Sequence, residues 1–290
     1  MKLWPTPTIR RAPSAGFLKE TTAGYKTLPL ICQGAGMNQP LYTHVGGGMT
    51  GSARYKWEQE NGIFQFDGKP VPKLLASISN SEWDAMMFGP YYNDRPKYYS
   101  CWFDFCLQYN PDMKFYLSDA WPQLEQLGHN PDSEAFFTET VFDQLAATKR
   151  NTYSETLDPL LKDYPGKVFV LPTSDAMVLA AKHFLRGELP GIEGIHRVIG
   201  KKERSLWKDQ LGHLGPGFER LEGYVFYATL YGKSPEKIQN EIPFGGKGDF
   251  PSPELDRMFR KIAWQAVTEH PHSGVSDENA DGINDAAERE

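Results

Sequence analysis

Apolar and polar positions form blocks along the chain, and these blocks predict strands that alternate with helices. Four short apolar runs each end in a turn or loop rich in Gly, Pro, Ser, Asp or Asn; they span residues 41–45, 83–88, 113–117 and 167–171. Stretches with helical spacing lie between and after them, at residues 97–109, 133–164, 176–186 and 216–231. Strands that alternate with helices need crossover connections, which make the strands parallel. The pattern predicts an α/β fold whose parallel sheet carries helices on both faces.

Ligands of such folds bind at the carboxyl ends of the strands, so the loops after the four runs are the first candidates for a site. Polar and aromatic residues gather in these loops, at residues 46–52, 89–96, 118–123 and 172–176. His44 either lines a cleft or is a core histidine with its polar atoms satisfied. Tyr91, Tyr92 and Trp121 either stack on sugar rings or cover the edge of the core.

Two acidic residues, Asp119 and Asp175, also follow predicted strands. They either support a site or cap the helix that comes next, as most such residues do.

The composition is that of a globular protein with an acidic balance. Of the 290 residues, 40% are hydrophobic and the formal net charge is −6, so no basic excess is available to neutralise phosphates. Nucleic acid is therefore not an expected partner.

No apolar run approaches the roughly 18 residues of a membrane span, and residues 1–14 resemble neither a signal peptide nor a first strand. The three cysteines are expected to be buried thiols rather than a disulfide framework.

Asp209 and His213 lie just before a helix that Pro216 and Gly217 are suited to open. A carboxylate that binds one imidazole nitrogen fixes the tautomer and leaves the other nitrogen free to accept a proton from a nucleophile. This is the acid–base half of a hydrolase triad. The alternative is a local hydrogen bond or a surface ion pair without catalytic meaning.

The chain resembles the SGNH, or GDSL-type, hydrolase family between about residue 41 and residue 235. The likeness is carried by His44 with the three glycines at 46–48, and by WDAMMFGPYYNDRP, NPDMKFYLSDAWP and DQLGHLGPGFERLEGYVFYATLYGKSP. The resemblance implies a flavodoxin-like, three-layer αβα sandwich and an esterase, lipase or carbohydrate deacetylase that needs no metal for its chemistry. It is closest to exported bacterial members of the family.

The resemblance also implies roles for individual residues. His213 would be the general base and Asp209 its orienting acid, although the family usually places this Asp three residues before the His and here it is four before. Gly47 and Asn93 would donate the hydrogen bonds of an oxyanion hole. Asn93 lies farther from its strand than in the family pattern, so a simple turn residue is the alternative.

The nucleophile is the missing part of the pattern. The family places its Ser in a GDS or GNS turn directly after the first strand, and the chain has no such turn. Ser14 is the first candidate; Thr21, Thr22 and Ser52 are the others. An inactive hydrolase fold that binds calcium and carbohydrate is the alternative to an enzyme.

A calcium-type loop closes the chain beyond a last predicted helix at residues 253–268 and a polar linker that contains His270 and His272. The two histidines read as part of this linker rather than as a metal site, because no third ligand supports one. In DENADGINDAAE (277–288) oxygen-bearing residues occupy positions 1, 3, 5, 9 and 12, and a glycine occupies position 6; these ligands are Asp277, Asn279, Asp281, Asp285 and Glu288.

The spacing of this loop is similar to thrombospondin type 3 and related bacterial repeats, which are typical of extracytoplasmic proteins. Its alternative is an acidic, disordered tail.

Together these observations predict an irregular segment at residues 1–13, an SGNH-type domain at 14–269, and a linker with a structural calcium loop at 270–290. The expected activity is hydrolysis of a small ester, with an acylated carbohydrate as one candidate, outside the cytoplasm.

Overall fold

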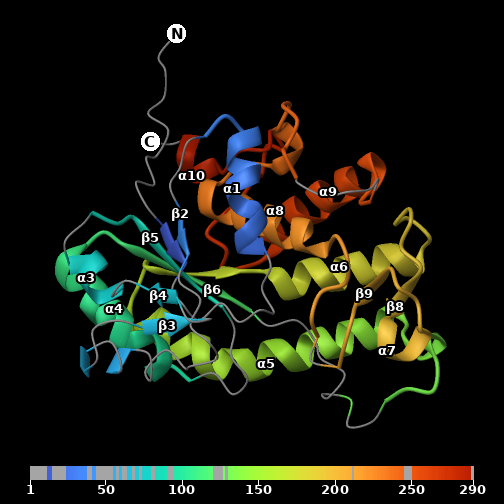
Figure 1. Cartoon of the computed structure of the whole chain (residues 1–290), viewed down its shortest axis with the longest axis horizontal. Helices are drawn as coiled ribbons and strands as arrows, with labels where there is room; N and C mark the ends of the chain where they lie inside the picture. Colours follow the sequence, from blue (N-terminus) through green and yellow to red (C-terminus); the bar gives the residue numbers. More distant parts are fainter. Residues whose placement is uncertain are drawn as a thin grey trace. The chain divides into compact units, whose positions relative to one another are not determined.

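The computed structural model of this chain (Figure 1) describes most of the sequence beyond residue 81 and shorter pieces before it. The described residues are 12–14, 24–37, 41–43, 55–56, 59–60, 64–66, 69–71, 74–79, 82–89, 95–119, 127, 130–210, 212–244 and 250–288. The chain divides into two compact units, which are described separately. The first consists of Met1–Lys19, Asn38–Ser118 and Tyr153–Phe169, and the second of Glu20–Met37, Asp119–Thr152 and Val170–Glu290.

A five-stranded sheet forms the centre of the first unit. Its strands lie in the order β2-β1-β5-β6-β7. The bounds are Leu41–Thr43 for β2, Ala12–Ser14 for β1, Ala85–Phe88 for β5, Lys114–Ser118 for β6 and Val168–Leu171 for β7. β1 pairs in parallel with both β2 and β5, and β5 pairs in parallel with β6. The prediction of an α/β fold with a parallel sheet is therefore confirmed.

Four of these strands fall on the predicted apolar runs, but β1 does not. Sequence reasoning predicts no strand here and starts the domain at Ser14, because a three-residue stretch that contains Pro13 has neither alternation nor a full set of N–H donors. The structure nevertheless places it between β2 and β5, with Ser14 opposite Thr43 on one side and Met87 on the other.

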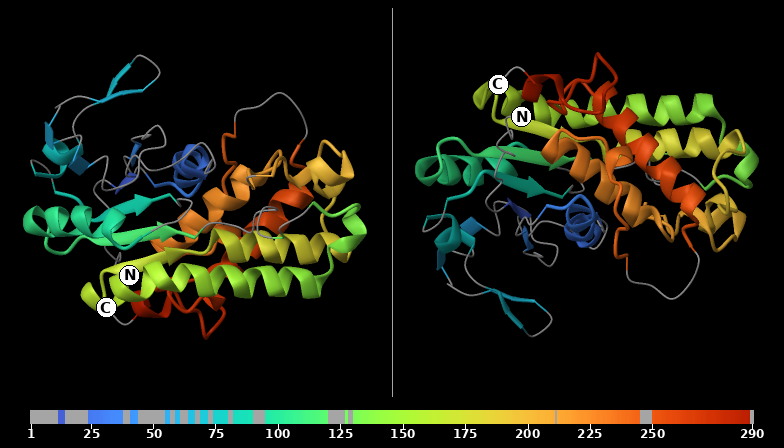
Figure 2. Two further views of the ribbon diagram at one scale, coloured as in Figure 1. Left: turned by 90° about the horizontal axis from the view of Figure 1, so that it is seen from below. Right: turned by 90° about the horizontal axis from the view of Figure 1, so that it is seen from above.

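Both faces of the central strands are covered. All four residues of β5 are buried, as are the last four of β6. Because neighbouring side chains on a strand point to opposite faces, continuous burial means that neither face meets water. On one face, α4 (Lys97–Tyr109) stacks its Phe103 on Phe115 of β6, with ring centroids 3.9 Å apart. Figure 2 shows α4 running alongside β5 and β6.

Three smaller elements complete the first unit. They are the antiparallel pair β3 (Phe64–Phe66) and β4 (Lys69–Val71) and the short helix α3 (Leu74–Ser79). The long helix α5 (Glu139–Asp163) crosses the boundary between the units, as does β7.

Helices dominate the second unit. They are α1 (Gly24–Gly34), α6 (Thr173–Leu185), α8 (Phe218–Tyr231) and α9 (Pro253–Glu269), with the short η2 (Glu134–Phe136), α7 (Arg197–Gly200), η3 (Pro235–Lys237) and α10 (Asp285–Glu288). A two-stranded parallel sheet joins β8 (Gly194–His196) to β9 (Ser205–Trp207). α8 packs against both α1 and α9 (Figure 1).

Close contact between α1 and α8 depends on Gly223. A Cβ at this position would lie 2.1 Å from Oγ1 of Thr27, which itself donates a hydrogen bond of 2.8 Å to the Glu219 carbonyl. Any larger residue at position 223 would therefore push the two helices apart.

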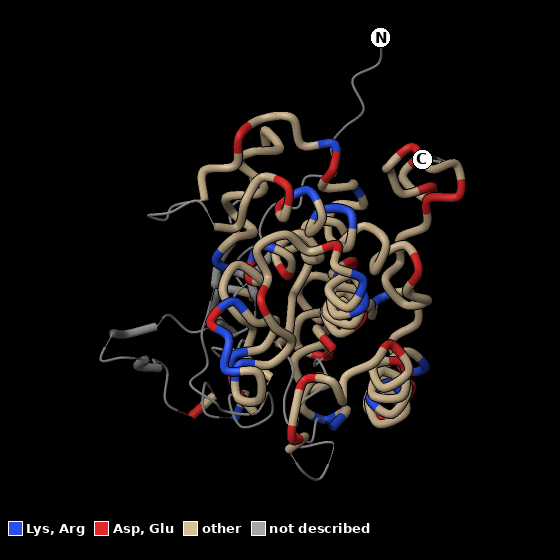
Figure 3. The backbone as a smooth tube through the Cα atoms, turned by 90° about the vertical axis from the view of Figure 1, so that its right-hand side faces the viewer, with Lys and Arg blue, Asp and Glu red and all other residues tan. Residues whose placement is uncertain are grey.

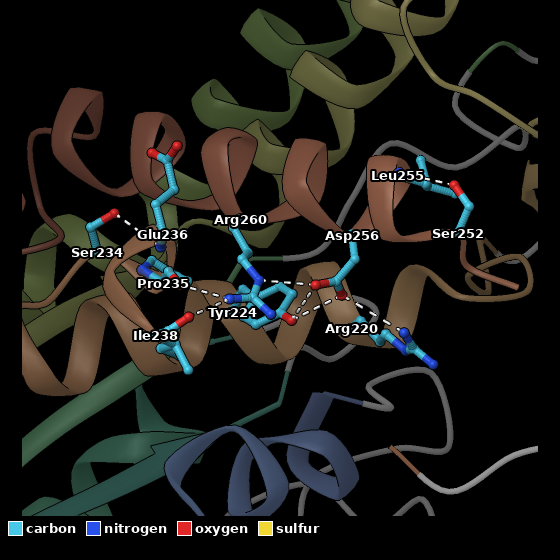
Figure 4. Close-up of polar contacts among 10 residues, drawn as sticks. All are labelled: Arg220, Tyr224, Ser234, Pro235, Glu236, Ile238, Ser252, Leu255, Asp256 and Arg260. Carbon is cyan, nitrogen blue, oxygen red and sulfur yellow. Dashed lines mark hydrogen bonds and ion pairs between the residues drawn. The ribbon is translucent and has the colours of Figure 1, made fainter. Parts of the chain in front are cut away.

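A partly buried polar network fixes α9 on α8 (Figure 4). The Tyr224 hydroxyl donates to the Asp256 carboxylate at 2.9 Å, and Nε of Arg260 donates to the same carboxylate at 2.9 Å. Arg260 also donates to the carbonyls of Pro235 and Ile238, so the loop after α8 is held by the same side chain. Hydrogen bonds of this charged kind are roughly twice as strong as neutral ones.

The predicted linker after α9 is partly buried: exposed residues alternate with residues that pack on the second unit. His270, Ser273 and Val275 are buried, and the carbonyl of His272 accepts a hydrogen bond of 2.8 Å from Val170 at the end of β7. The Ser273 hydroxyl donates to the His270 carbonyl at 3.1 Å, so its polar atoms are satisfied within the turn. The polar composition therefore concealed a docked segment.

All three cysteines are free thiols; Cys32 and Cys106 are buried as expected, whereas Cys101 is partly exposed. Among the described helices, none has the length and apolar character needed to cross a membrane.

Candidate functional site

Asp209 and His213 lie on a tight hairpin between β9 and α8. Trp207 and Leu214 form an antiparallel bridge, and the amide of Lys208 donates to the carbonyl of His213 at 2.8 Å. α8 then begins at Phe218, after Gly217 in the N-cap position. The helix predicted at 216–231 is confirmed, although it begins at Phe218 and Pro216 lies before it.

Two glycines make the hairpin possible. Gly212 has φ +80°, a left-handed conformation that side chains disfavour, and its amide donates to the Asp209 carbonyl at 3.1 Å. Gly215 donates to the Leu206 carbonyl at 2.7 Å, and a Cβ there would lie 1.7 Å from the carbonyl oxygen of Ser205. The backbone at position 215 thus approaches β9 more closely than any other residue type allows.

Within this hairpin the structure brings the two predicted side chains together. Oδ2 of Asp209 lies 2.5 Å from Nδ1 of His213, and Oδ1 accepts a hydrogen bond of 3.2 Å from the His213 amide. Nδ1 faces a carboxylate, which only accepts, so Nδ1 carries the ring proton and Nε2 presents a lone pair. The His213 side chain is 21% exposed, which leaves the pair neither buried in the core nor free in water. This arrangement allows Nε2 to take a proton from a bound nucleophile.

A second histidine, His183, makes a similar contact with a carboxylate but does not lie in a hairpin. Nδ1 of His183, in the last turn of α6, contacts the carboxylate of Glu188 in the turn that follows the helix. A histidine–carboxylate contact alone is therefore not a sign of catalysis in this chain, and His183 provides an internal control for His213.

Ser14 is the last residue of the strand β1. Parallel strands end at the same edge of a sheet, so the carboxyl ends of β2, β1 and β5 lie side by side. The segments with Gly47 and Asn93 follow β2 and β5 in the chain. Ser14 belongs to the first unit, whereas Asp209 and His213 belong to the second.

Several predicted residues lie outside the described part of the chain. They are the oxyanion-hole candidates Gly47 and Asn93, the cleft candidates His44, Tyr91, Tyr92 and Trp121, and the alternative nucleophiles Thr21, Thr22 and Ser52.

The acidic loop at residues 277–288 belongs to the second unit, and its acidic positions gather beside the C-terminus in Figure 3. The indole N–H of Trp264 in α9 donates to Oδ2 of Asp277 at 2.9 Å, and the carbonyl of Gly282 accepts from the amide of Ser234 at 2.9 Å. Gly282 has φ +78°, which is the conformation that its place in the loop requires. The loop is thus tied to α9 and to the segment after α8.

The oxygen-bearing side chains of this loop contact each other or a shared amide. Asp277 and Asn279 both accept from the amide of Asp281, at 2.9 and 3.0 Å, and the Asn279 side chain donates to Glu288 at 3.1 Å. A hydrogen bond with Asp281 raises the pKa of Glu288, because the two carboxyl groups share a proton. Within the described residues, no group of three or more His, Cys, Asp or Glu side chains is arranged to hold a metal ion. The residue types fit calcium, and the side chains would have to converge to bind it.

Asp119 binds the start of the next helix, which was the alternative to a site, whereas Asp175 lies in the first turn of that helix and forms an ion pair. Asp119 follows β6, and its carboxylate accepts hydrogen bonds from the Ser174 amide at 2.9 Å and from the Thr173 hydroxyl at 3.0 Å, at the start of α6. Asp175 pairs with Arg150 at 2.9 Å. Burial, and then the charge of Asp175, raises the pKa of Asp119 to about 7, although the hydrogen bonds from Ser174 and Thr173 lower it.

Sequence reasoning missed His196 and Glu134. The Oε1 atom of Glu134 accepts from the amides of Ile195 and His196, at 2.7 and 2.6 Å, and so anchors β8 beside the hairpin. No signal in the sequence points to either residue, since β8 is only three residues long and Glu134 lies sixty residues away.

Comparison with protein-family models, with curated proteins and with solved structures gave no significant match.

Replacement of Asp119 by Asn is expected to change how stability depends on pH. A carboxyl whose pKa is raised on folding stabilises the protein fully below the pKa of the unfolded state, 3.8, and this contribution is lost as the pH rises through about 7. Between these values the free energy of unfolding of the wild type should fall relative to Asp119→Asn, by up to about 1 kcal/mol per pH unit. Urea unfolding at several pH values measures this.

Asp143→Asn, at an exposed carboxylate paired with Lys182, is the control and should leave the slope unchanged. Equal slopes for wild type and Asp119→Asn would contradict a raised pKa at Asp119.

Proposed function

We propose that this protein is a serine-type ester hydrolase of the SGNH kind. The observation that carries the proposal is the contact between Asp209 and His213, which leaves Nε2 of a partly exposed imidazole free to accept a proton. The position of Ser14 at the carboxyl end of β1 adds to it.

The sheet gives independent support for the fold that this family has. Numbered by their order in the chain, its strands lie 2-1-3-4-5, which is the flavodoxin-like order, with β1 next to the point where the order reverses. Together with the burial of β5 and β6 on both faces, this order supports a three-layer αβα sandwich. Ligands of such sheets bind at that switch point, and Ser14 ends the strand beside it.

The proposed chemistry is acyl transfer to water. Nε2 of His213 takes the proton of the Ser14 hydroxyl as Oγ attacks the ester carbonyl, and donors from Gly47 and Asn93 stabilise the oxyanion. The imidazolium, held by Asp209, returns the proton to the departing alcohol and leaves an acyl-enzyme. A water molecule, deprotonated by His213 in turn, then releases the acid and restores Ser14. The mechanism requires that Ser14 Oγ and His213 Nε2 come within hydrogen-bond reach.

The substrate we propose is a small ester, with an O-acyl group on a carbohydrate as the favoured form. This choice rests on the aromatic residues Tyr91, Tyr92 and Trp121, which follow predicted strands in the sequence and suit stacking on sugar rings.

Removal of the proposed general base should abolish ester hydrolysis while the fold persists. We expect His213→Ala to lower kcat/KM for a short-chain aryl acetate by about 10²- to 10⁴-fold, the range for a general base. Asp209→Asn should also lower it, because the amide oxygen accepts the hydrogen bond from Nδ1 more weakly and the amide carries no charge. Initial rates, with circular dichroism to check folding, measure both.

His183→Ala removes the other histidine–carboxylate contact and should keep wild-type activity. Equal activity in His213→Ala and His183→Ala would contradict the enzyme hypothesis and leave the non-catalytic alternative, a binding protein on the same fold.

We further propose that the loop at residues 277–288 binds a structural calcium ion through Asp277, Asn279, Asp281, Asp285 and Glu288. The support is the spacing of the ligands, the left-handed Gly282, and side chains that already turn toward one another. When bound, calcium would neutralise these carboxylates and tie α9 to the segment after α8. Calcium at extracellular concentration saturates even weak sites, so this role fits an extracytoplasmic location.

Calcium should raise the melting temperature of the wild type relative to excess chelator. At ten times the Kd, mass action contributes about 1.4 kcal/mol, which corresponds to a shift of a few degrees for a chain of this size. Trp264 fluorescence should change in the same titration, because its indole donates to Asp277.

Asp281→Asn should remove most of the shift, whereas Glu278→Gln, at position 2 of the loop, should retain it. No shift at millimolar calcium, or an equal shift in Asp281→Asn, would contradict a calcium site.

A further inference from the structure

His196 is held in place from two sides, and its proton position follows from this. It ends β8, where its register partner in β9 is Trp207, and it is the N-cap of α7. Its amide donates to Glu134 at 2.6 Å, and its Nδ1 accepts a hydrogen bond of 3.3 Å from the amide of Val198. A nitrogen that accepts has no proton, so the neutral ring carries its proton on Nε2.

The Nε2 donor points into the protein and has no complete hydrogen bond. The side chain is 3% exposed, and Nε2 is one of the buried atoms without a partner among the described residues. Buried donors without partners are rare in folded proteins and call for an explanation. Nε1 of Trp207, the register partner of His196 in β9, is also buried without a hydrogen-bond partner among the described residues.

The polar groups that act on the ring belong to Asp209. Burial lowers the pKa of His196 to about 4, while the main-chain carbonyl of Asp209 and its negative charge raise it. His196 pairs with Trp207 across the β8–β9 sheet, and Trp207 lies two residues before Asp209, so the ring lies beside the start of the hairpin. Since Nδ1 accepts from Val198, Nε2 is the ring nitrogen left to donate to the Asp209 carbonyl. Hydrogen bonds of a catalytic site are often long in the free protein and tighten when substrate binds.

The same carbonyl closes the turn that positions His213. It accepts the amide of Gly212, and the carboxylate of the same residue, Asp209, binds Nδ1 and the amide of His213. A donor that fixes the Asp209 main chain therefore also fixes the direction of its carboxylate and, through it, of the imidazole.

We propose that His196 is a positioning residue for the Asp209–His213 pair: its Nε2–H approaches the Asp209 carbonyl and holds the hairpin in the orientation that the general base needs. The catalytic consequence rests on the proposed hydrolase function, but the structural consequence does not. His196 acts as a neutral donor and touches no reacting atom.

Two substitutions separate the donor from the rest of the side chain. His196→Asn keeps an oxygen near the Nδ1 position to accept from Val198, and Asn is a good N-cap, but it has no atom at the Nε2 position. His196→Gln reaches that position with an amide N–H. If the Asn variant does not fold, His196→Leu fills the ring volume without a donor and replaces it in the comparison. Trp207→Phe removes the neighbouring unpaired donor and serves as the control.

The first readout needs no activity. A proton between Nδ1 of His213 and a carboxylate gives a far-downfield NMR resonance, which is assigned by its loss in Asp209→Asn. We expect this resonance to move upfield or to be lost by exchange in His196→Asn, and to remain in His196→Gln and Trp207→Phe. An unchanged resonance in a folded His196→Asn would overturn the proposal, whatever the activity.

The second readout is kinetic. If the protein hydrolyses aryl acetates, His196→Asn should lower kcat by about 10- to 100-fold, as expected for a misplaced catalytic group, with KM little changed and with recovery in His196→Gln. Equal loss in the Asn and Gln variants would reduce His196 to a packing residue and overturn its role as a donor. If the wild type has no activity but the resonance responds as expected, the proposed hydrolase function fails and the positioning role of His196 stands.

Discussion

The second unit depends on the burial of α8 along nearly its whole length. Its residues from Leu221 to Tyr231 are all buried, with α1 and α9 packed against it. Such packing tolerates little variation: Gly223 brings α1 within contact distance, and the carboxylate of Asp256 joins α9 to Tyr224. A helix surrounded in this way has a fixed start, and the hairpin with Asp209 and His213 leads directly into that start.

Backbone constraints, rather than side-chain packing alone, set the geometry of the proposed acid–base pair. Gly215 approaches the main chain of β9 where no Cβ fits, and Gly212 reverses the chain in a left-handed conformation. Between them the Asp209 carboxylate receives both the amide and Nδ1 of His213. The charge of Asp209 thus has a fixed direction, and Nε2 of His213 is left as a base. The contact of His183 with Glu188 lacks this hairpin, which is why it makes a useful comparison.

Sequence patterns predicted the elements with strong periodicity. The apolar runs of β5, β6 and β7 and the amphipathic stripe of α9 were evident, and α4 begins and ends as expected. β1 was missed because three residues with a central proline carry no strand signal, and its place comes from pairing with β2 and β5. The segment at 270–276 was read as a linker because its residues are polar, yet the turn satisfies them internally.

The candidate site shows the same limit. Asp209 and His213 are four residues apart, so local sequence was enough to pair them. His196 and Glu134 act from distant positions, through contacts that only the folded chain brings about. Ser14 was chosen by elimination, and the strand that gives it a position could not be foreseen from residues 1–14.

The central claim is that His213 activates a hydroxyl at the end of β1. Treatment with a fluorophosphonate, which phosphonylates an activated serine, followed by peptide mass mapping tests it most directly. We expect one equivalent of label on Ser14 in the wild type and none in His213→Ala. Labelling of Ser52, Thr21 or Thr22 instead, labelling of Ser14 that persists in His213→Ala, or no labelling of the folded wild type would contradict it.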